Sequence, residues 1–433
     1  MPPVSQDSFE DLFEDLNPSL RTEVPGPKSR RCIDRLARTE CPAITARRSR
    51  RAVSLGVADD DPIVWAEAVG ANVIDVDGNR FVDMTAGFGV ATLGHRHPDV
   101  VRATADQSTR LLHAMGDAYP DATRIDLLDG LIDAAPDNMS AAILGLSGAD
   151  AVDATVKTAI LATGRTGVLA FRGGYHGLSL GAVPLQGYKS AFADPFRDIL
   201  HPHVHHLPYG AAIADVEAVL AGGDVGMVLV EPIQARGGVR VPPTGWLPAL
   251  REAAHKHGAI LALDEIYTGF ARTGTAFACQ YDDVQADLMC VGKALGGGFP
   301  ISACLGTRQV MDAWGASKGE AIHTQTFLGH PVGCAAGLVT LKLLPQTAAR
   351  ATRVGEQLRT SLEQAGFGVR GRGLLLGVEL DTRSLTVSRA LMRRGWIALP
   401  AGMHAEVLSL SPPVCLSTNQ IKAFVTALTE VCA

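Results

Sequence analysis

The chain has 433 residues, of which 47% are apolar, and a formal net charge of -6. That apolar content is enough for a large core, and the length suggests two or three domains. Basic residues are scattered except in the short run 46–51, which we interpret as a solvated surface patch, so neither nucleic acid nor a membrane is expected as a partner.

The sequence also indicates where the protein resides. It contains no uninterrupted stretch of 18 apolar residues, and residues 5–15 are rich in acidic side chains where a signal peptide needs a basic start. We therefore expect a soluble cytoplasmic protein. The eight cysteines are dispersed without a Cys-x-x-Cys pair, so we expect reduced thiols rather than a zinc site.

The N-terminal region reads as an arm followed by a hairpin. Residues 1–50 are polar, and the prolines within 24–28 argue against a helix there, so this arm is expected to lie on a larger body or on a partner. Asp77-Gly78 separates two short apolar runs, 72–76 and 80–84. This dipeptide predicts a tight antiparallel hairpin with positive φ at both central turn residues.

A helical pattern over 98–135, interrupted at Tyr119-Pro120, precedes an apolar strand at 141–146. The strand runs into Ser147-Gly148-Ala149-Asp150, which opens a helix through residue 162. The free N–H groups and the dipole of such a helix start favour an anion. From this stretch alone, a phosphate site and an ordinary helix cap are equally good interpretations.

Further apolar runs alternate with helical segments such as 246–257. The runs are at 167–171, 225–230, 259–263 and 287–291. This alternation predicts a mainly parallel sheet covered on both faces, with functional residues at the carboxyl ends of its strands. The polar residues at those ends are Ser147, residues 172–176, Glu231, Asp264 and Lys293.

After residue 326 the pattern changes to that of a smaller α+β domain. We expect helices at 332–344, 353–365, 385–394 and 421–432 and a strand at 373–380. The predicted organisation is therefore an arm and hairpin (1–83) that join the small domain, a large domain (84–326) and a small C-terminal domain (327–433).

Lys293 and Asp264 stand out chemically. Lys293 follows an apolar strand and has glycines on both sides, which lets a bound group approach closely; the alternative is a surface lysine. Apolar surroundings disfavour its ammonium form, as a Schiff-base lysine requires. Asp264 could be a helix cap or a surface acid, but beside that lysine it could keep a heterocyclic nitrogen protonated. With Tyr175-His176 to stack on a ring and residues 147–149 for a phosphate, the set describes a pyridoxal phosphate site.

The two stretches that carry this pair resemble a known family. Residues 263–274 (LDEIYTGFARTG) and 287–298 (DLMCVGKALGGG) are similar to the signature of class III aminotransferases, the family of ornithine and 4-aminobutyrate aminotransferases. Further matching segments are Gly94-His95, 147–148, 174–177, 230–234, 323–331 and 371–374. The resemblance implies the α/β architecture of fold type I, with a large helix-covered sheet and a smaller α+β domain.

The resemblance also implies roles for individual residues. Lys293 matches the lysine that holds pyridoxal 5'-phosphate as a Schiff base and moves the proton between substrate and cofactor. Asp264 matches the partner of the pyridine nitrogen. Ile266 matches the residue packed on one ring face and Tyr175 the aromatic residue on the other, with His176 beside it.

The remaining correspondences concern the phosphate and the assembly. Ser147, Gly148 and Ala149 match the phosphate loop, and Glu231 matches a polar residue lining the site. Thr326 matches a threonine that reaches the phosphate of the neighbouring subunit, which implies a homodimer with shared active sites.

Three departures from the family pattern bear on binding. Ala149 replaces the serine or threonine of many members, so one hydroxyl to the phosphate is missing. Arg236 stands where amino-acid-specific members have a glutamate, and Ser409 stands where they have the arginine that pairs with it and grips an α-carboxylate. Arg236 could bind a donor carboxylate from a new direction, the substrate could lack a carboxylate, as an amino sugar or polyamine aldehyde does, or Arg236 could face solvent.

We therefore expect an aminotransferase that moves an amino group between a primary amine and a ketone or aldehyde, with specialised metabolism such as amino-sugar antibiotic biosynthesis as one setting. The first alternative is an isomerase, namely an epimerase, racemase or aminomutase, because cofactor motifs do not report the fate of the nitrogen. A decarboxylating lyase and a catalytically silent protein on the same fold are further alternatives. Retention of Lys293, Asp264 and Thr326 argues against the silent protein.

Overall fold

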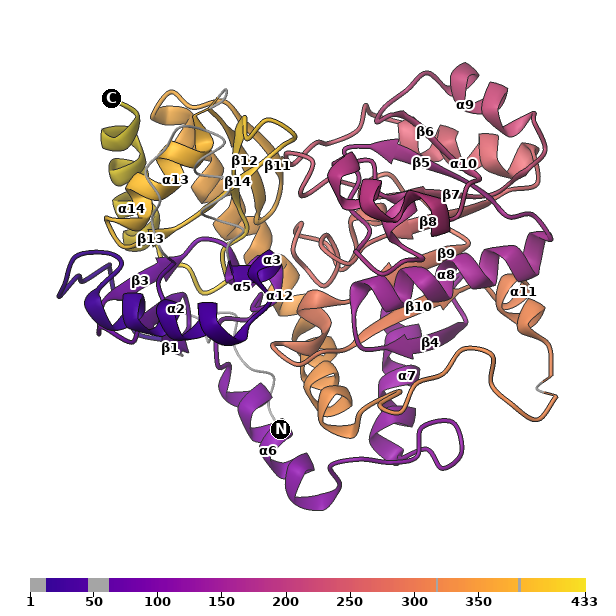
Figure 1. The fold of residues 1–433 in the computed structure, drawn as a ribbon, viewed down its shortest axis with the longest axis horizontal. Coiled ribbons are helices and arrows are strands. Elements are labelled where there is room, and N and C mark those ends of the chain that lie inside the picture. Colours follow the sequence, from indigo (N-terminus) through magenta and orange to yellow (C-terminus); the bar gives the residue numbers. More distant parts are fainter. Residues whose placement is uncertain (1–12, 46–61, 317, 381–382) are drawn as a thin grey trace.

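The computed structural model describes residues 13–45, 62–316, 318–380 and 383–433. The basic run 46–51 lies outside these residues. A seven-stranded sheet dominates the larger half of the molecule (Figure 1). Its strands, in order across the sheet, are β4 (Ala141–Gly145), β10 (Ser302–Gly306), β9 (Leu288–Val291), β8 (Ile260–Asp264), β7 (Val225–Val230), β5 (Gly167–Arg172) and β6 (Val204–Pro208).

The predicted mainly parallel sheet is confirmed. Each neighbouring pair from β9 to β6 is parallel, and β10 alone runs antiparallel, pairing with both β9 and β4. β10 and β6 were not predicted from the sequence. β6 is an edge strand whose half-buried residues include two histidines, and β10 consists largely of small residues, so neither shows a strong apolar run.

Helices cover both faces of this sheet. On one face lie α8 (Gly148–Thr163) and α11 (Arg308–Met311), and on the other α7 (Ala122–Ala134), α9 (Ile213–Leu220) and α10 (Trp246–Lys256). Alternate residues of one strand enter different cores: Met227 and Leu229 belong to the core on the α8 face, whereas Val228 belongs to the core on the opposite face. Burial on both faces explains why the inner strands read as continuous apolar runs.

The strand register gathers polar residues at one edge of the sheet. Asp264 ends β8 and lies opposite Cys290 of β9, and Val230 of β7 lies opposite Leu263. On the other side, Gly145 at the end of β4 lies opposite Ser302 at the start of β10. The residues that follow β4, β7, β8 and β9 therefore meet at this edge.

Two smaller sheets form the other half of the molecule. One is antiparallel and contains β11 (Val369–Arg372), β12 (Leu375–Glu379), β15 (Val407–Leu410) and β14 (Leu399–Ala401). The other contains β1 (Trp65–Val69), β2 (Asn72–Asp75), β3 (Arg80–Asp83) and β13 (Trp396–Ile397). Because β3 pairs with β13, the N-terminal hairpin and a C-terminal strand share one sheet. The domain boundaries themselves stay predictions.

The hairpin β2–β3 confirms the pairing predicted around Asp77-Gly78, but its turn differs. Only Gly78 has positive φ, at 85°, and the N–H of Gly78 donates to the Asp75 carbonyl. Residues 76–79 connect the strands, the N–H of Asp75 donates to the Asn79 carbonyl at 3.0 Å, and one glycine in the left-handed region suffices for this turn.

The helices around the small sheets include one that was predicted as two. They are α5 (Ala86–Gly89), α6 (Pro98–Arg110), α12 (Pro331–Gln364), α13 (Ser384–Met392) and α14 (Thr418–Cys432). α12 runs without a break through the predicted gap, with Pro345 inside it, because its buried side packs on α6, α7 and α14 along its length. In the described part of the chain, α12 alone is long and apolar enough to cross a membrane, and 56% of that window is buried inside the protein, as in a core helix.

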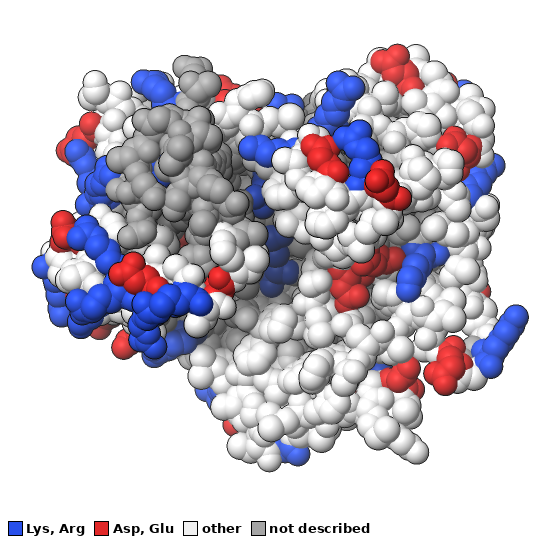
Figure 2. Space-filling model, in the orientation of Figure 1, with Lys and Arg blue, Asp and Glu red and all other residues white. Residues whose placement is uncertain are grey.

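The N-terminal region contains two helices, α2 (Pro27–Thr39) and α3 (Pro42–Thr45). Residues 24–28 were expected to exclude a helix, and this was wrong for Pro27 and Lys28. Pro27 occupies the first helical position, where no N–H is needed. Asp77 caps α2 from the hairpin: its carboxylate accepts from the N–H groups of Lys28 and Ser29 at 2.6 and 2.8 Å. Figure 2 shows lysine and arginine side chains gathered over this N-terminal part.

Candidate active site

The polar edge of the large sheet opens into a cavity of about 300 Å³. Its lining comprises Gly148, Ala149, Tyr175, His176, Gly177, Leu178, Glu231, Ala235, Arg236, Asp264, Ile266, Tyr267 and Lys293. Most residues selected from the sequence are therefore brought together. Ser147 lines an adjoining cavity of about 260 Å³ that shares Gly148 and Lys293 with the first.

Gly292 separates β9 from Lys293, which begins a short 3-10 turn and lines both cavities. Its φ of 40° lies in the left-handed region, a conformation that a non-glycine residue adopts only where its surroundings enforce it. Burial lowers the pKa of the Lys293 ammonium, and Arg236 lowers it further, while Asp264 and Glu231 oppose the effect. The amine is therefore more readily deprotonated than an exposed lysine.

Asp264 is held in a fixed orientation at the end of β8. One carboxylate oxygen, Oδ1, accepts from the N–H of Ile266 at 3.0 Å, and the other, Oδ2, lies 2.8 Å from Nδ1 of His176. Burial acts to lower the pKa of His176, but the hydrogen bond and charge of Asp264 outweigh it and raise the pKa. The site thus contains a buried carboxylate with a fixed direction and a protonatable partner.

The start of α8 provides an anion site. The Ser147 side chain caps the helix by accepting from the N–H of Asp150 at 3.2 Å. The N–H groups of Gly148 and Ala149, in the first helical turn, have no acceptor among the described residues, and both residues line the cavity. A side chain at Gly148 would place its Cβ 2.9 Å from Ile266 Cδ1, so glycine allows the helix start and Ile266 to approach each other.

Glu231 supports the cavity wall from behind. It is buried, and its two carboxylate oxygens accept from the N–H groups of Tyr175 at 2.9 Å and Ala235 at 3.2 Å. Burial raises the pKa of Glu231 to about 7. One carboxyl group therefore fixes the loop that carries Tyr175 and the loop that carries Arg236.

Comparison with known proteins identifies the family. Residues 56–432 match the family model described as Aminotransferase class-III. The chain is 35% identical over 374 residues to acetylornithine aminotransferase from Methanopyrus kandleri, covering 85% of this chain and 94% of that protein. It is 38% identical over 379 residues to acetylornithine aminotransferase from Mycolicibacterium smegmatis, covering 86% and 93%. The chain belongs to the class III aminotransferases.

Solved structures agree with this assignment. Ornithine aminotransferase from Toxoplasma gondii superposes with a TM-score of 0.79 at 28% identity, covering 89% of this chain and 93% of that one. An amine transaminase from an uncultivated Pseudomonas species, in its PLP-bound form, gives a TM-score of 0.80 at 28% identity, covering 86% and 95%. The protein is therefore a fold-type-I enzyme, and its cofactor is pyridoxal 5'-phosphate.

The cavity of this class III aminotransferase fits that cofactor chemically. The Lys293 amine would hold the cofactor aldehyde, the Asp264 carboxylate would face the pyridine nitrogen, and the free N–H groups of Gly148 and Ala149 would receive the phosphate. Ile266 and Tyr175, the residues expected against the two ring faces, both line the cavity.

Arg236 lies at the cavity on the loop after β7 and stacks on aromatic rings. Its guanidinium carbon is 4.4 Å from the Tyr175 ring centroid and 5.4 Å from that of Tyr188. Gly402, in the connection between β14 and β15, donates its N–H to the Arg236 carbonyl at 3.0 Å and accepts from the Tyr188 hydroxyl at 3.1 Å. Among the described residues no carboxylate pairs with Arg236, in agreement with the loss of the glutamate at this position.

Two tyrosines of the site were not selected from the sequence. Tyr267 lines the cavity, with its ring centroid 4.6 Å from Lys293 Nζ and its hydroxyl 3.0 Å from Ser411 Oγ. The sequence could have indicated Tyr267, because it lies three residues after Asp264 in the same motif. Tyr188 lies in an irregular loop, and nothing in the surrounding sequence indicates that it meets Arg236.

Two selected residues lie outside both cavities of their own chain. Thr326 is exposed on the connection that precedes α12. Ser409 is half-buried on β15, opposite Gly377 and Leu399, where its side chain does not contribute to the cavity lining.

Proposed function

We propose that this class III aminotransferase takes the amino group of a donor that carries a carboxylate and passes it to a keto acid or aldehyde. The observation that carries the proposal is Arg236, a guanidinium at the cavity, stacked on Tyr175, without a carboxylate partner among the described residues. Such a group binds a substrate carboxylate with two parallel hydrogen bonds. The relatives named for acetylornithine and ornithine act on compounds of this kind.

The residues around the cofactor would serve both halves of the reaction. Pyridoxal phosphate, when bound, supplies the electron sink that allows a proton to leave the carbon bearing the amino group. Lys293, whose pKa is lowered by burial, accepts that proton at Nζ and moves it between the substrate and the cofactor. Asp264, fixed by His176 and the Ile266 N–H, would hold negative charge beside the ring nitrogen of the bound cofactor.

The alternative is a donor without a carboxylate, such as an amino sugar or a diamine. It is favoured by Ser409, which stands where family members have the arginine that grips an α-carboxylate. Under this alternative Arg236 would not contribute to donor binding.

A half-reaction assay separates the two. The holoenzyme is mixed with glutamate, alanine, acetylornithine, 4-aminobutyrate, diamines and amino sugars singly, and the visible absorbance of the cofactor is followed. Arg236→Met is expected to weaken binding of carboxylate donors about 10- to 100-fold. Arg240→Met is the matched control, because Arg240 lies in the same loop but faces Glu406 at 3.8 Å. Fast conversion by a diamine or amino sugar, unchanged in Arg236→Met, would overturn the carboxylate proposal.

An isomerase on the same cavity stays the main alternative to amino transfer. The discriminating measurement is nitrogen balance: donor is incubated with enzyme in the presence and absence of an amino acceptor. Amino transfer predicts stoichiometric amination of the acceptor, whereas an isomerase would scramble or move the amino group with no acceptor present.

We also propose that two copies of the chain form a dimer with shared sites. Exposed apolar side chains lie on two adjacent loops: Leu112 and Met115 on one, Ile322 and Phe327 on the other, and the Phe327 ring is 5.3 Å from that of His113. Thr326 directly precedes Phe327 and is exposed. Mixing Lys293→Ala subunits with Thr326→Ala subunits tests this arrangement, since a shared site predicts that the mixed dimer regains activity that neither parent has.

A further inference from the structure

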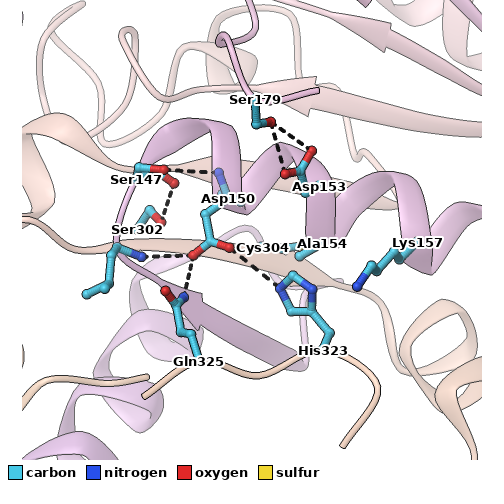
Figure 3. A network of polar contacts seen from close by, with 12 residues as sticks. Ser147, Asp150, Asp153, Ala154, Lys157, Ser179, Ser302, Cys304, His323 and Gln325 are labelled. Carbon is cyan, nitrogen blue, oxygen red and sulfur yellow. Dashed lines mark hydrogen bonds and ion pairs between the residues drawn. The ribbon is translucent and has the colours of Figure 1, made fainter. Parts of the chain in front are cut away.

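The connection that carries Thr326 is anchored on α8, the helix whose first turn faces the cofactor site (Figure 3). The Trp314 Nε1 donates to Thr158 Oγ1 at 3.0 Å, and Lys157 Nζ donates to the Ile322 carbonyl at 3.1 Å. At the start of the helix, Gln325 Nε2 donates to the Asp150 carboxylate. The connection therefore follows one side of α8 from its middle to its N-terminus.

Asp150 holds two segments with one oxygen. Its Oδ2 accepts from the Leu146 N–H at 3.0 Å, immediately before the turn 147–149, and also from Gln325. Its Oδ1 lies 3.8 Å from Nε2 of His323. In Figure 3, Gln325 and His323 both point toward this carboxylate.

The backbone is shaped to admit this carboxylate. A Cβ on Gly145 would lie 2.3 Å from Asp150 Oδ2, so only glycine lets the side chain fold back over the end of β4. From the other side, Ser302 Oγ donates to the Ser147 carbonyl at 2.7 Å and fixes the same turn. The position of the turn therefore depends on the position of Asp150.

We propose that Asp150 and Gln325 are positioning residues that couple cofactor binding to subunit association. This inference rests on the proposed dimer with shared sites, in which Thr326 faces the neighbouring subunit. Gln325 precedes Thr326 directly, so the contact fixes the loop that faces the partner relative to the turn that receives the phosphate in its own subunit. Loss of the contact therefore weakens both the binding of pyridoxal phosphate and the dimer.

A charge exchange tests the contact itself. In Gln325→Glu two carboxylates face each other, with Asp153, Lys157 and His323 as the neighbouring charged or titratable groups. Adding Asp150→Asn removes the repulsion between the two carboxylates, because asparagine is uncharged, while its side-chain oxygen still accepts from the Leu146 N–H. A residue with only a general structural role would show no such rescue.

Two quantities are measured for each variant: the dissociation constant of pyridoxal phosphate from fluorescence titration of the cofactor-free protein, and the dimer dissociation constant from sedimentation. Gln325→Glu is expected to raise both about tenfold or more, and the double variant to lower both again by about threefold or more relative to Gln325→Glu. Lys318→Ala, an exposed residue of the same connection, is the control and is expected to change neither.

Cofactor binding by Gln325→Glu equal to that of the wild type, or failure of Asp150→Asn to rescue it, would overturn the inference. If Gln325→Glu does not fold, as judged by circular dichroism, Gln325→Ala replaces it and is expected to weaken both equilibria severalfold. A wild-type protein that binds no pyridoxal phosphate or stays monomeric would contradict the proposed function instead.

Discussion

Glu231→Gln offers a quantitative test of the buried network behind the site. The Glu231 carboxyl group is buried between the Tyr175 and Ala235 N–H groups, and burial raises its pKa from 4.5 to about 7. Between these two values the folded protein keeps a proton that the unfolded chain has released. The folded state therefore binds more protons, and its stability falls as the pH rises through this range.

The magnitude follows from the two pKa values. The difference between 4.5 and about 7 corresponds to about 3 kcal/mol of unfolding free energy in total. Of this, about 2 kcal/mol is lost between about pH 5.5 and pH 8, where the folded carboxyl group ionises. The raised pKa of His176 adds a loss of the same sign, since its contribution is complete below its ordinary pKa and disappears as the pH rises through the raised one.

Urea unfolding of the cofactor-free protein at about pH 5.5 and pH 8 measures the effect. Because glutamine does not titrate, Glu231→Gln is expected to lose about 2 kcal/mol less than the wild type over this interval. Glu252→Gln, at an exposed position on α10, is the control and is expected to follow the wild type. An equal pH dependence in Glu231→Gln and the wild type would refute the reasoning.

Three further changes test the local geometry. In Gly148→Val the new Cβ would lie 2.9 Å from Ile266 Cδ1, so the helix start and Ile266 must move apart. The dissociation constant of pyridoxal phosphate, measured by titration, is expected to rise at least tenfold. Ala149→Ser adds a hydroxyl at the phosphate turn and is expected to lower that constant severalfold; an unchanged value would show that the backbone N–H groups suffice. The buried guanidinium of Arg272 donates to the Leu374 and Pro412 carbonyls and to Thr92 Oγ1, and a single lysine ammonium cannot reach all three. Arg272→Lys is therefore expected to lower the free energy of unfolding, measured in urea, by about 2 to 4 kcal/mol. A loss below about 0.5 kcal/mol would contradict that account.

Apolar periodicity was sufficient to predict most of the large sheet. Strands such as β7 and β8 are buried on both faces, so their burial is visible as continuous apolar runs. The same argument could not find β10, whose short run Ser-Ala-Cys-Leu-Gly resembles a turn, although β10 brings Ser302 to the phosphate turn. Its position is decided by pairing with β4 and β9, which are distant in sequence.

The site was predictable where a motif is local and not where loops meet. Lys293, Asp264 and the turn at 147–149 follow strands whose ends the pattern located, so their convergence could be expected. The stacking of Arg236 on Tyr175 and Tyr188 depends on irregular loops that Gly402 holds together. Such loops have no periodic pattern of apolar residues from which their contacts could be predicted. Ser409 lies on β15 outside the cavity lining, and the backbone of the connection before β15 approaches Arg236 instead, so its role in substrate binding stays a prediction.

The most direct test of the central claim is chemical trapping at Lys293. The protein is saturated with pyridoxal 5'-phosphate, reduced with borohydride and digested, and the peptide that carries the cofactor is identified by mass spectrometry. We expect the label on Lys293 alone, and no label or cofactor absorption band above the free-cofactor control in Lys293→Ala. A label on another lysine, or an unchanged absorption band in Lys293→Ala, would contradict the assignment of this residue as the cofactor anchor.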